Sequence, residues 1–387
     1  MKRLLAAALA ALCLAALPAC GAAKTEESVP VQEEAPAPPP EPTPEELAAR
    51  EIDDLLASLT TEEKVGQLFF VRCPAESAVE DVTTYHLGGY VLFGRDFADK
   101  TADAIIQTLR DYQEAAAADT GIPLLLGVDE EGGTVVRVSS NPHLRGEKYR
   151  SPQKLLSAGG TEALVADTAD KDALLSALGI NVNLAPVADV STSSADFIYD
   201  RTCGLDASGT AECTRAVVEQ MASDGMGSVL KHFPGYGSNV DTHTGIAVDN
   251  RSLDQFRAAD FLPFSAGMEA GGGKAAVLVS HNIMTAVDDA LPASLSPAVH
   301  DLLRTELGFD GVVMTDDLAM DAVAAYAEDG AVAVMALQAG NDLIITTDYR
   351  TQIPKVLEAL EAGTLSMDTI DTACRRLLTW KQSLGLL

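Results

Sequence analysis

The chain has 387 residues, of which 47% are hydrophobic and only 5% aromatic, and its formal net charge at pH 7 is −30. This length and apolar content suit one large core, and an α/β barrel of about 300–340 residues would form it as a single domain. The acidic charge argues against nucleic acid as a partner, because proteins that bind phosphate backbones need basic patches.

The first nineteen residues have the pattern of an export signal. Lys2 and Arg3 precede an apolar run, residues 4–17, that is too short to span a bilayer. The sequence LPACG that follows resembles a bacterial lipobox, in which the cysteine, here Cys20, is lipidated and becomes the mature N-terminus. Pro18 departs from that pattern, which leaves cleavage without lipidation as the alternative. We expect an exported protein, lipid-anchored to the membrane and facing outside the cytoplasm, or a secreted one if lipidation fails.

The next segment, residues 20–48, is rich in Pro, Glu and Ala and has no apolar periodicity. Such a segment cannot bury enough surface to fold, so we expect an extended tether before a domain that spans residues 49–387. Four cysteines lie in that domain, and their spacing predicts neither a metal site nor a disulfide framework, which leaves their pairing open. They are Cys73, Cys203, Cys213 and Cys374.

Within the domain, short apolar runs alternate with stretches of helical periodicity. The runs are continuously apolar, as parallel strands buried on both faces are. They are residues 66–72, 88–94, 122–129, 181–189, 227–233, 275–282, 311–317 and 342–348. Eight strands alternating with helices predict a single (β/α)8 TIM-type barrel, with an open doubly wound sheet as the alternative. Two final helical stretches, within 353–363 and 367–385, are expected to cap the barrel.

Polar residues gather at the carboxyl ends of these runs. They are Asp129, Lys231, His232, His281, Asp316 and Asp317. In a barrel all of these ends meet at one mouth, which is where the active sites of this fold are built. The placement therefore predicts an enzyme.

The segment KHFPGYGSNVDTHTG, residues 231–245, follows the fifth run and contains Asp241 and His243 between glycines. The carboxylate of Asp241 can accept a hydrogen bond from Nδ1 of His243, which fixes the tautomer and leaves Nε2 free to transfer a proton. A surface turn and a metal site are the alternatives for this loop. The histidine spacing typical of metal sites is missing, so we expect neither a metal nor a cofactor.

Several segments resemble glycoside hydrolase family 3, in its bacterial β-N-acetylhexosaminidase branch. KHFPGYGSNVDTH is similar to the Lys-His-Phe-Pro-Gly-His-Gly…Asp-Ser-His signature of that family, and VDEEGGTVVRV to its Val-Asp-Gln-Glu-Gly-Gly stretch. LAPVADV, DRTCG, VSHNIMTAVDDALPASLSP and GVVMTDDLAM match further segments in the same order. The resemblance covers residues 55–345 and implies the same barrel.

The resemblance also implies roles for individual residues. Asp316, which follows Thr315, aligns with the nucleophile that forms a glycosyl-enzyme intermediate, and Asp317 is expected to be structural. His243 aligns with the general acid/base and Asp241 with the residue that orients it. The implied contacts to the sugar are Asp129, Arg137, Arg201, Lys231 and His232.

His281 is expected only to pack or hydrogen-bond behind the site. Two residues depart from the family pattern. Tyr236 replaces a histidine and Glu130 a glutamine; we expect altered loop packing and intact chemistry.

The implied activity is that of a retaining exo-β-N-acetylglucosaminidase on terminal β-linked GlcNAc, with peptidoglycan fragments as the expected substrate and a monomer as the expected state. The alternatives are a phosphorylase with the same intermediate, a β-glycosidase of other specificity, an inactive lipid-tethered glycan-binding protein, and a metal-dependent barrel hydrolase.

Overall fold

The computed structural model describes residues 42–239, 247–320, 323, 326–327 and 330–387. The predicted signal peptide, Cys20 and most of the predicted tether therefore lie outside the described residues. The predicted dyad of Asp241 and His243 does so too.

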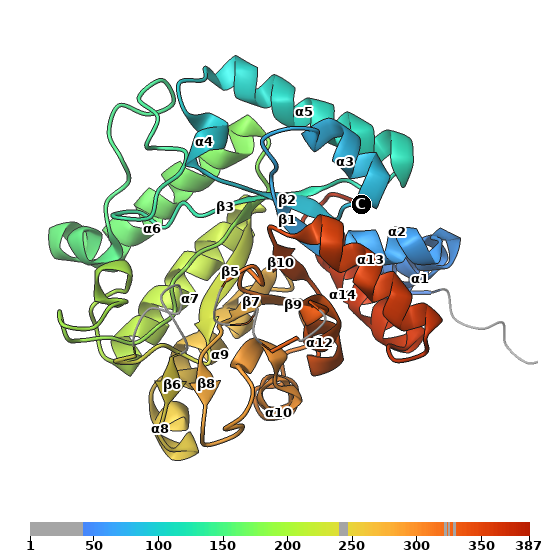
Figure 1. The fold of residues 1–387 in the computed structure, drawn as a ribbon. Helices are drawn as coiled ribbons and strands as arrows, with labels where there is room; N and C mark the ends of the chain where they lie inside the picture. Colours follow the sequence, from blue (N-terminus) through green and yellow to red (C-terminus); the bar gives the residue numbers. More distant parts are fainter. Residues whose placement is uncertain (1–41, 240–246, 321–322, 324–325, 328–329) are drawn as a thin grey trace, which may run out of the picture. The chain divides into compact units, whose positions relative to one another are not determined.

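Eight parallel strands form one sheet of order β10-β1-β2-β3-β4-β5-β7-β9 (Figure 1). Its strands are β1 Phe69–Arg72, β2 Gly89–Leu92, β3 Leu125–Val128, β4 Val182–Asn183, β5 Gly227–Phe233, β7 Ala275–Val279, β9 Val313–Thr315 and β10 Ile344–Thr346. A parallel bridge between Met314 and Leu343 joins the two ends of the sheet, which closes it into a barrel. Every strand lies within one of the eight predicted runs, so the (β/α)8 prediction is confirmed.

A second sheet was not predicted. β6 Val248–Asp249 pairs in parallel with β8 Ile283–Met284 beside the barrel mouth. Each of these strands has two residues, which is too short for any alternation to mark it in the sequence.

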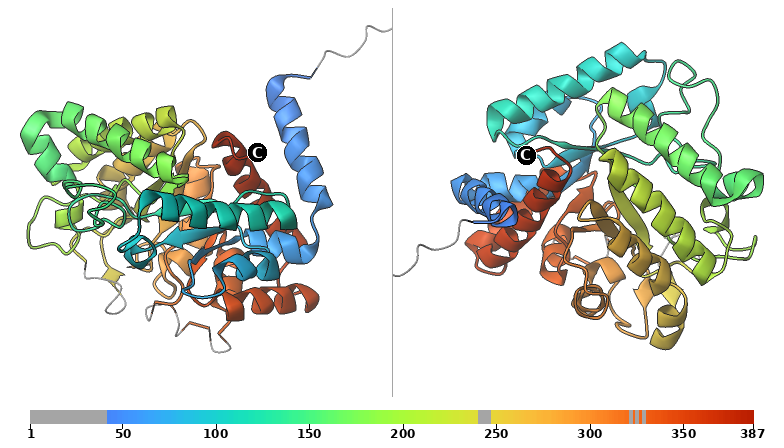
Figure 2. Two further views of the ribbon diagram at one scale, coloured as in Figure 1. Left: turned by 90° about the horizontal axis from the view of Figure 1, so that it is seen from above. Right: turned by 180° about the vertical axis from the view of Figure 1, so that it is seen from behind.

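Helices surround the strands, as the view from behind in Figure 2 shows. They are α1 Pro44–Ser58, α2 Thr61–Gln67, α3 Ala78–Tyr85, α4 Gly94–Phe97, α5 Ala102–Asp119, α6 Pro152–Leu178, α7 Ala207–Asp224, α8 Leu253–Ala258, α9 Phe261–Ala270, α10 Pro297–Asp301, α12 Val332–Ala339, α13 Tyr349–Glu361 and α14 Met367–Ser383. Two 3-10 turns (Tyr199–Arg201 and Ala293–Leu295) and a π-helical stretch (Leu302–Glu306) complete the described elements. The start of α10 has a serine cap, because the Ser296 side chain accepts a hydrogen bond from the Val299 N–H and Pro297 follows it.

Helix α14 covers the amino-terminal end of the barrel. The Lys381 Nζ donates to Gln67 Oε1 at 2.8 Å before β1, and the Trp380 Nε1 donates to the Lys274 carbonyl at 3.0 Å before β7. This confirms the predicted capping role for the last helix, whereas α13 is the outer helix that follows the eighth strand.

The tether was predicted to reach residue 48, but helix α1 begins at Pro44. A proline in the first turn, followed by Glu45 and Glu46, favours a helix start, since proline lacks only an N–H that would be unpaired there and acidic residues complement the helix dipole. The prolines of residues 38–44 gave the whole stretch the composition of a tether. The buried side chains of Ile52 and Leu56 fix the helix instead.

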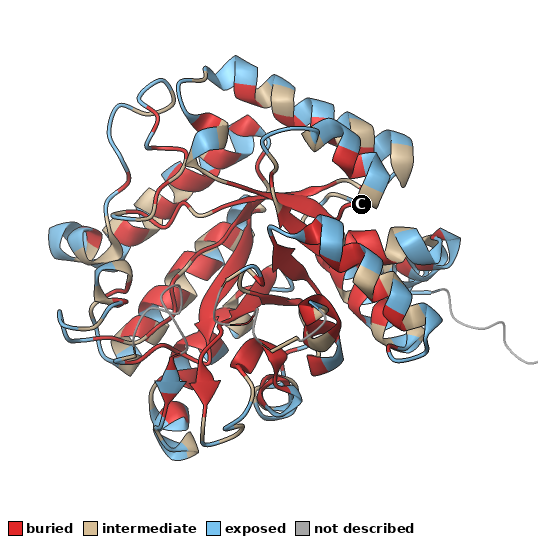
Figure 3. Cartoon of the chain, viewed as in Figure 1, coloured by how far each residue is buried: buried red, intermediate tan, exposed pale blue. Residues whose placement is uncertain are grey.

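The strands are the most buried part of the chain (Figure 3). Inside the barrel the chain needs glycine at residue 127, because a Cβ there would lie 2.4 Å from the ring of Phe70. The four cysteines of the described chain are all free and buried. Among the described residues, no helix is long and apolar enough to cross a membrane.

Candidate active site

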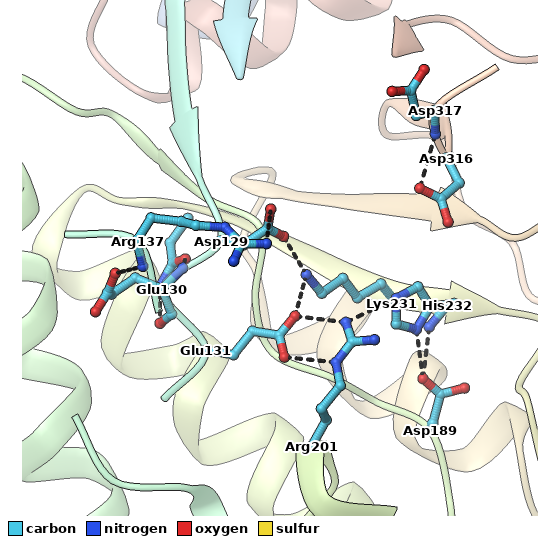
Figure 4. A network of polar contacts seen from close by, with 11 residues as sticks. Asp129, Glu130, Glu131, Arg137, Asp189, Arg201, Lys231, His232, Asp316 and Asp317 are labelled. Carbon is cyan, nitrogen blue, oxygen red and sulfur yellow. Dashed lines mark hydrogen bonds and ion pairs between the residues drawn. The ribbon is translucent and has the colours of Figure 1, made fainter. Parts of the chain in front are cut away.

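A cavity of about 380 Å³ opens at the carboxyl ends of the barrel strands. All six of the predicted catalytic and binding residues that the structure describes line it, and Figure 4 shows them together. They are Asp129, Arg137, Arg201, Lys231, His232 and Asp316. The remaining walls are Arg72, Val91, Phe93, Val135, Leu184, Leu278, Asp317, Met320 and Ile345.

Lys231 lies at the centre of the polar network. It is only 2% exposed, and its Nζ is 2.7 Å from Asp129 Oδ1 and 2.6 Å from Glu131 Oε1. Two carboxylates therefore compensate one buried ammonium, whose position β5 sets. Asp129 also lines the cavity.

Arg201 shares the carboxylate of Glu131 with Lys231. Its Nε and Nη2 donate to the two oxygens of Glu131 at 3.0 and 2.8 Å, which is the bidentate geometry that favours arginine at carboxylates. Burial alone would raise the pKa of Glu131, but the charges of Lys231 and Arg201 outweigh it and hold that pKa well below its usual range. Glu131 is therefore ionised, and Arg201 is fixed as part of the cavity wall.

His232 is oriented by Asp189, a residue that the sequence analysis missed. Asp189 Oδ2 lies 2.8 Å from His232 Nδ1, and Arg201 Nη2 lies 3.2 Å from His232 Nε2. Because an arginine nitrogen can only donate, Nε2 accepts and the proton sits on Nδ1. The other oxygen of Asp189 accepts the Tyr236 N–H at 2.7 Å. One carboxylate thus fixes the histidine tautomer and the start of the loop that follows β5.

Tyr236, one of the two departures from the family pattern, packs over His232. Tyr236 is 2% exposed, and its ring lies edge-on to the imidazole with the centroids 5.1 Å apart; the ring centroid of Phe197 lies 5.9 Å from that of Tyr236. The substitution therefore places an aromatic ring against the histidine that lines the cavity.

The two aspartates at the end of β9 have different surroundings. Asp317 is bound to its neighbours, since its carboxylate accepts hydrogen bonds from the Ala319 N–H and from the N–H and hydroxyl of Thr347. Asp316 Oδ1 accepts the Asp317 N–H at 2.8 Å, and Asp316 also lines the cavity. His281 lies behind this pair, with Nδ1 against Ser294 Oγ and Nε2 against the Asp317 carbonyl, as expected of a packing residue.

Glu130, the other departure, is a buried carboxylate whose hydrogen-bond donors are neutral. It accepts the N–H groups of Arg137, Val138 and Ser139 and the Ser139 hydroxyl. It therefore shapes the loop that carries Arg137 to the cavity edge, where Arg137 Nη2 is 4.0 Å from Asp129 Oδ2.

The described residues on either side of 240–246 are held together by Arg251. Its guanidinium donates to Asp249, to Asp260 and to the carbonyl of Gly235, while Asn239 donates to Asp249 at 2.8 Å. Gly235 is required at this crossing, because its φ is +121° and a Cβ would lie 2.2 Å from Asp260 Oδ1. Burial raises the pKa of Asp260 to about 6 although Arg251 opposes the shift.

Three cavity or network residues were missed from the sequence, namely Arg72, Glu131 and Asp189. Arg72 and Asp189 end the predicted runs 66–72 and 181–189, so the rule that selected Asp129 and Asp316 would have found them. Glu131 stands two residues after Asp129 and carried no separate signal. Within the described part of the chain, no group of three or more His, Cys, Asp or Glu side chains is placed to hold a metal ion.

A barrel whose strand ends carry carboxylates and cations around one cavity is the architecture of a TIM-barrel enzyme. Residues 60–380 match the family model of the glycosyl hydrolase family 3 N terminal domain, and the chain therefore belongs to that family. This confirms the family that the sequence motifs indicated.

Relatives of known name agree with this assignment. The beta-hexosaminidase of Stenotrophomonas maltophilia is 35% identical over 291 residues, which are 72% of this chain and 82% of that protein. The beta-hexosaminidase LpqI of Mycobacterium tuberculosis is 32% identical over 338 residues, 84% of each chain. Among solved structures, a family 3 beta-N-acetylglucosaminidase from Paenibacillus superposes with a TM-score of 0.78 at 31% identity. That comparison covers 85% of this chain but 63% of the Paenibacillus protein, just under two thirds of its length.

Proposed function

We propose that the protein is a retaining exo-β-N-acetylglucosaminidase that removes terminal β-linked GlcNAc through a glycosyl-enzyme intermediate. The observation that carries the proposal is the cavity in which Asp316 faces Asp129, Arg137, Lys231 and His232. The names of the relatives, beta-hexosaminidase and beta-N-acetylglucosaminidase, support the sugar specificity.

In this mechanism one oxygen of Asp316 attacks the anomeric carbon and forms an ester bond while the bond to the leaving oxygen breaks. The leaving oxygen takes a proton from His243, which Asp241 orients; both residues lie outside the described part of the chain. Water then attacks the anomeric carbon, gives its proton to His243 and releases Asp316, so the product has the configuration of the substrate.

The binding residues divide the work of holding the sugar. Asp129 presents an acceptor to the hydroxyl groups, and Lys231 beside it presents a donor. The network through Glu131 and Arg201 keeps Lys231 and His232 in place before the sugar arrives, which lowers the reorganisation that binding requires.

The proposed location rests on the N-terminal sequence. The export signal, residues 1–19, and Cys20 favour a lipid anchor on the outer face of the membrane, where GlcNAc-terminated peptidoglycan fragments would be the natural substrate. We expect a lipoprotein-specific lipase to release the protein from the membrane. We also expect the Cys20→Ser variant to be lost from the membrane fraction. Equal membrane association of Cys20→Ser would contradict the anchor.

The test of the activity compares 4-nitrophenyl N-acetyl-β-D-glucosaminide with the corresponding glucoside, in the wild type and in Asp316→Ala. We expect turnover of the GlcNAc substrate with retention of configuration by NMR, and a loss of kcat on the order of 10⁴-fold in Asp316→Ala, because the covalent step loses its nucleophile. Azide, added as a replacement nucleophile, should restore part of the rate.

The matched control for that variant is Asp317→Ala. It removes a carboxylate that holds residues 319 and 347, so we expect a lower Tm and a smaller loss of kcat. Equal losses of kcat in the two variants would contradict the assignment of Asp316. Formation of GlcNAc 1-phosphate in phosphate buffer would identify a phosphorylase instead, and tight GlcNAc binding without turnover would identify a binding protein.

A further inference from the structure

Arg251, two residues after β6, joins three parts of the chain beside the barrel mouth. Its Nη2 donates to the Gly235 carbonyl at 3.2 Å and to Asp249 Oδ2 at 2.7 Å, and its Nη1 donates to Asp260 Oδ2 at 2.7 Å. Its Nε adds contacts of 3.1 and 3.0 Å to the two oxygens of Asp249. One guanidinium therefore connects the segment after β5 with β6 and with the residue before α9.

The segment after β5 lies directly against this guanidinium. Gly237 has a φ of +54°, and a Cβ there would lie 2.6 Å from Arg251 Cζ, so the close contact requires glycine. The ring of Phe256 packs against the same group, with its centroid 4.3 Å from Cζ. Because the guanidinium is planar and donates in fixed directions, the three nitrogens can serve these partners together, which the single ammonium of a lysine cannot do.

Asp249 extends the connection to the other end of the segment 240–246. Asn239, the last described residue before that segment, donates from Nδ2 to Asp249 Oδ2 at 2.8 Å. The carbonyl of Asp249 accepts the N–H and the hydroxyl of Thr285, next to β8. The chain is thus fixed to the β6–β8 sheet both where it enters the segment 240–246 and where it leaves it, and Arg251 binds the carboxylate at the centre.

The chain held in this way carries groups that the proposed mechanism uses. His232 lines the cavity, and its carbonyl accepts the Gly235 N–H at 2.8 Å. His243 and Asp241, the proposed acid/base and its partner, belong to the segment 240–246, outside the described residues. A general acid must come within hydrogen-bond reach of the leaving oxygen, so the fixed ends of the segment limit where its residues can lie.

We propose that Arg251 is a positioning residue for the acid/base step, because it fixes both ends of the segment that carries His243. Arg251 does not line the cavity, so it acts through that segment and not on the sugar. The inference rests on the proposed function, since it takes Asp241 and His243 as the acid/base pair. It adds a residue whose loss reduces the rate only where the leaving oxygen needs a proton.

The primary experiment measures kcat/KM of the full-length protein on two substrates, phenyl and 2,4-dinitrophenyl N-acetyl-β-D-glucosaminide. Dinitrophenolate leaves without a proton, whereas phenolate needs one from the acid. In Arg251→Lys we expect a loss of about 10- to 100-fold on the phenyl substrate, which is a part of the about 10²- to 10⁴-fold that general acid catalysis contributes. We expect little change on the dinitrophenyl substrate, so the dinitrophenyl-to-phenyl ratio of kcat/KM should rise by the same factor.

Arg304 supplies the matched control. Its guanidinium also binds one buried aspartate, Asp342 at 2.6 Å, and two carbonyls, those of Phe309 and Gly311. These partners precede β9 and β10, at the amino-terminal end of the barrel. Arg304→Lys should lower the Tm and retain the wild-type ratio when activity is measured well below that Tm. A rise in the ratio as large as in Arg251→Lys would show that general loosening of the fold causes it, and the proposal fails.

Asn239→Ala tests the same connection without removing a charge. It breaks the bond to Asp249 and leaves both ion pairs of Arg251 in place, so the variant is expected to fold. The ratio should rise, by less than in Arg251→Lys. An unchanged ratio in Asn239→Ala together with an equal loss on both substrates in Arg251→Lys overturns the inference, because Arg251 then only supports the scaffold.

Combination with His243→Ala separates failure of this inference from failure of the proposed function. His243→Ala alone should raise the ratio further than the other variants, and adding Arg251→Lys should then change it little, because two residues that act on one step are not additive. An undiminished effect of Arg251→Lys in that background overturns the route through His243. An unchanged ratio in His243→Ala alone, or no turnover by the wild type, contradicts the proposed function instead.

Discussion

The two sides of the barrel mouth carry the same kinds of cation but differ in how far the described carboxylates pair with them. Above β4 and β5, Arg201 and Lys231 converge on Glu131, and every one of these charges has a partner within 3.0 Å. Above β1 and β2, Arg72 lies on Phe93, and among the described residues no carboxylate forms an ion pair with it. This difference shows that residue type alone does not determine whether an arginine is held in an ion pair or is left open to the cavity. The carboxylates within reach of the guanidinium determine it.

Asp172 shows a third way of handling a buried charge. It is 1% exposed on α6, beside Asp224 at the end of α7. A carboxylate in this position can take up a proton and become neutral, which an arginine cannot do. Pairing, protonation and exposure to the cavity are thus three solutions in this barrel, and the first two can be tested by removing one group.

The largest effect is expected from Glu131→Gln, which removes the carboxylate that Lys231 and Arg201 share. It leaves Lys231 and Arg201 buried with no shared carboxylate, and breaking a buried pair in this way costs about 3–5 kcal/mol of unfolding free energy. Urea denaturation of the two proteins measures the difference. The control is Glu130→Gln, since Glu130 is equally buried but its partners are neutral N–H and O–H groups. A loss in Glu130→Gln as large as in Glu131→Gln would show that burial, and not the stranded cations, sets the cost.

A smaller effect, on catalysis more than on folding, is expected from Asp189→Asn. The amide cannot hold His232 and the Tyr236 N–H as the carboxylate does, so the tautomer and the position of His232 are no longer fixed. We expect a loss of about 10- to 100-fold in kcat/KM on the 4-nitrophenyl GlcNAc substrate, together with altered ¹⁵N shifts of the His232 ring.

Asp119→Asn is the control for that experiment, because Asp119 Oδ2 lies 2.8 Å from His86 Nδ1 in an equivalent pair that does not line the cavity. It should retain wild-type kcat/KM. Unchanged kcat/KM in Asp189→Asn would show that the tautomer of His232 is set by Arg201 alone.

The last prediction concerns the pH dependence of stability. Burial, and next to it the Asp224 carboxylate, raises the pKa of Asp172 to about 8 from an ordinary value of 3.8. The folded chain therefore holds a proton that the unfolded chain releases, and the contribution of Asp172 to stability is full below pH 3.8 and is lost as pH rises through about 8. Asp172→Asn should remove this dependence, so its unfolding free energy relative to the wild type should be higher at pH 9 than at pH 5, by an amount on the order of 4 kcal/mol. A parallel pH profile in the two proteins would contradict the raised pKa.

Much of this molecule follows from local sequence. Eight continuously apolar runs specify eight strands, and the ends of the runs specify the mouth, because parallel strands in a barrel all present their carboxyl ends on one side. Asp316, Lys231 and His232 were placed in one cavity on that ground and on family motifs, and the structure brings them together. The start of α1 at Pro44 was missed, since a proline-rich composition outweighed the buried Ile52 and Leu56 that only the folded chain reveals.

The sequence could not predict which charged and polar side chains pair with one another. Glu131 and Arg201 are 70 residues apart, and Asp189 and His232 are 43 apart, so no local pattern joins them. The sequence by itself determined the barrel, the family and the residues at its mouth, because these depend on periodicity and on motifs along the chain. The tertiary structure alone decided that Arg201 is held by Glu131 and that Arg72 is left to face the cavity, because a side chain's charge is compensated by whatever distant strands bring within hydrogen-bond reach.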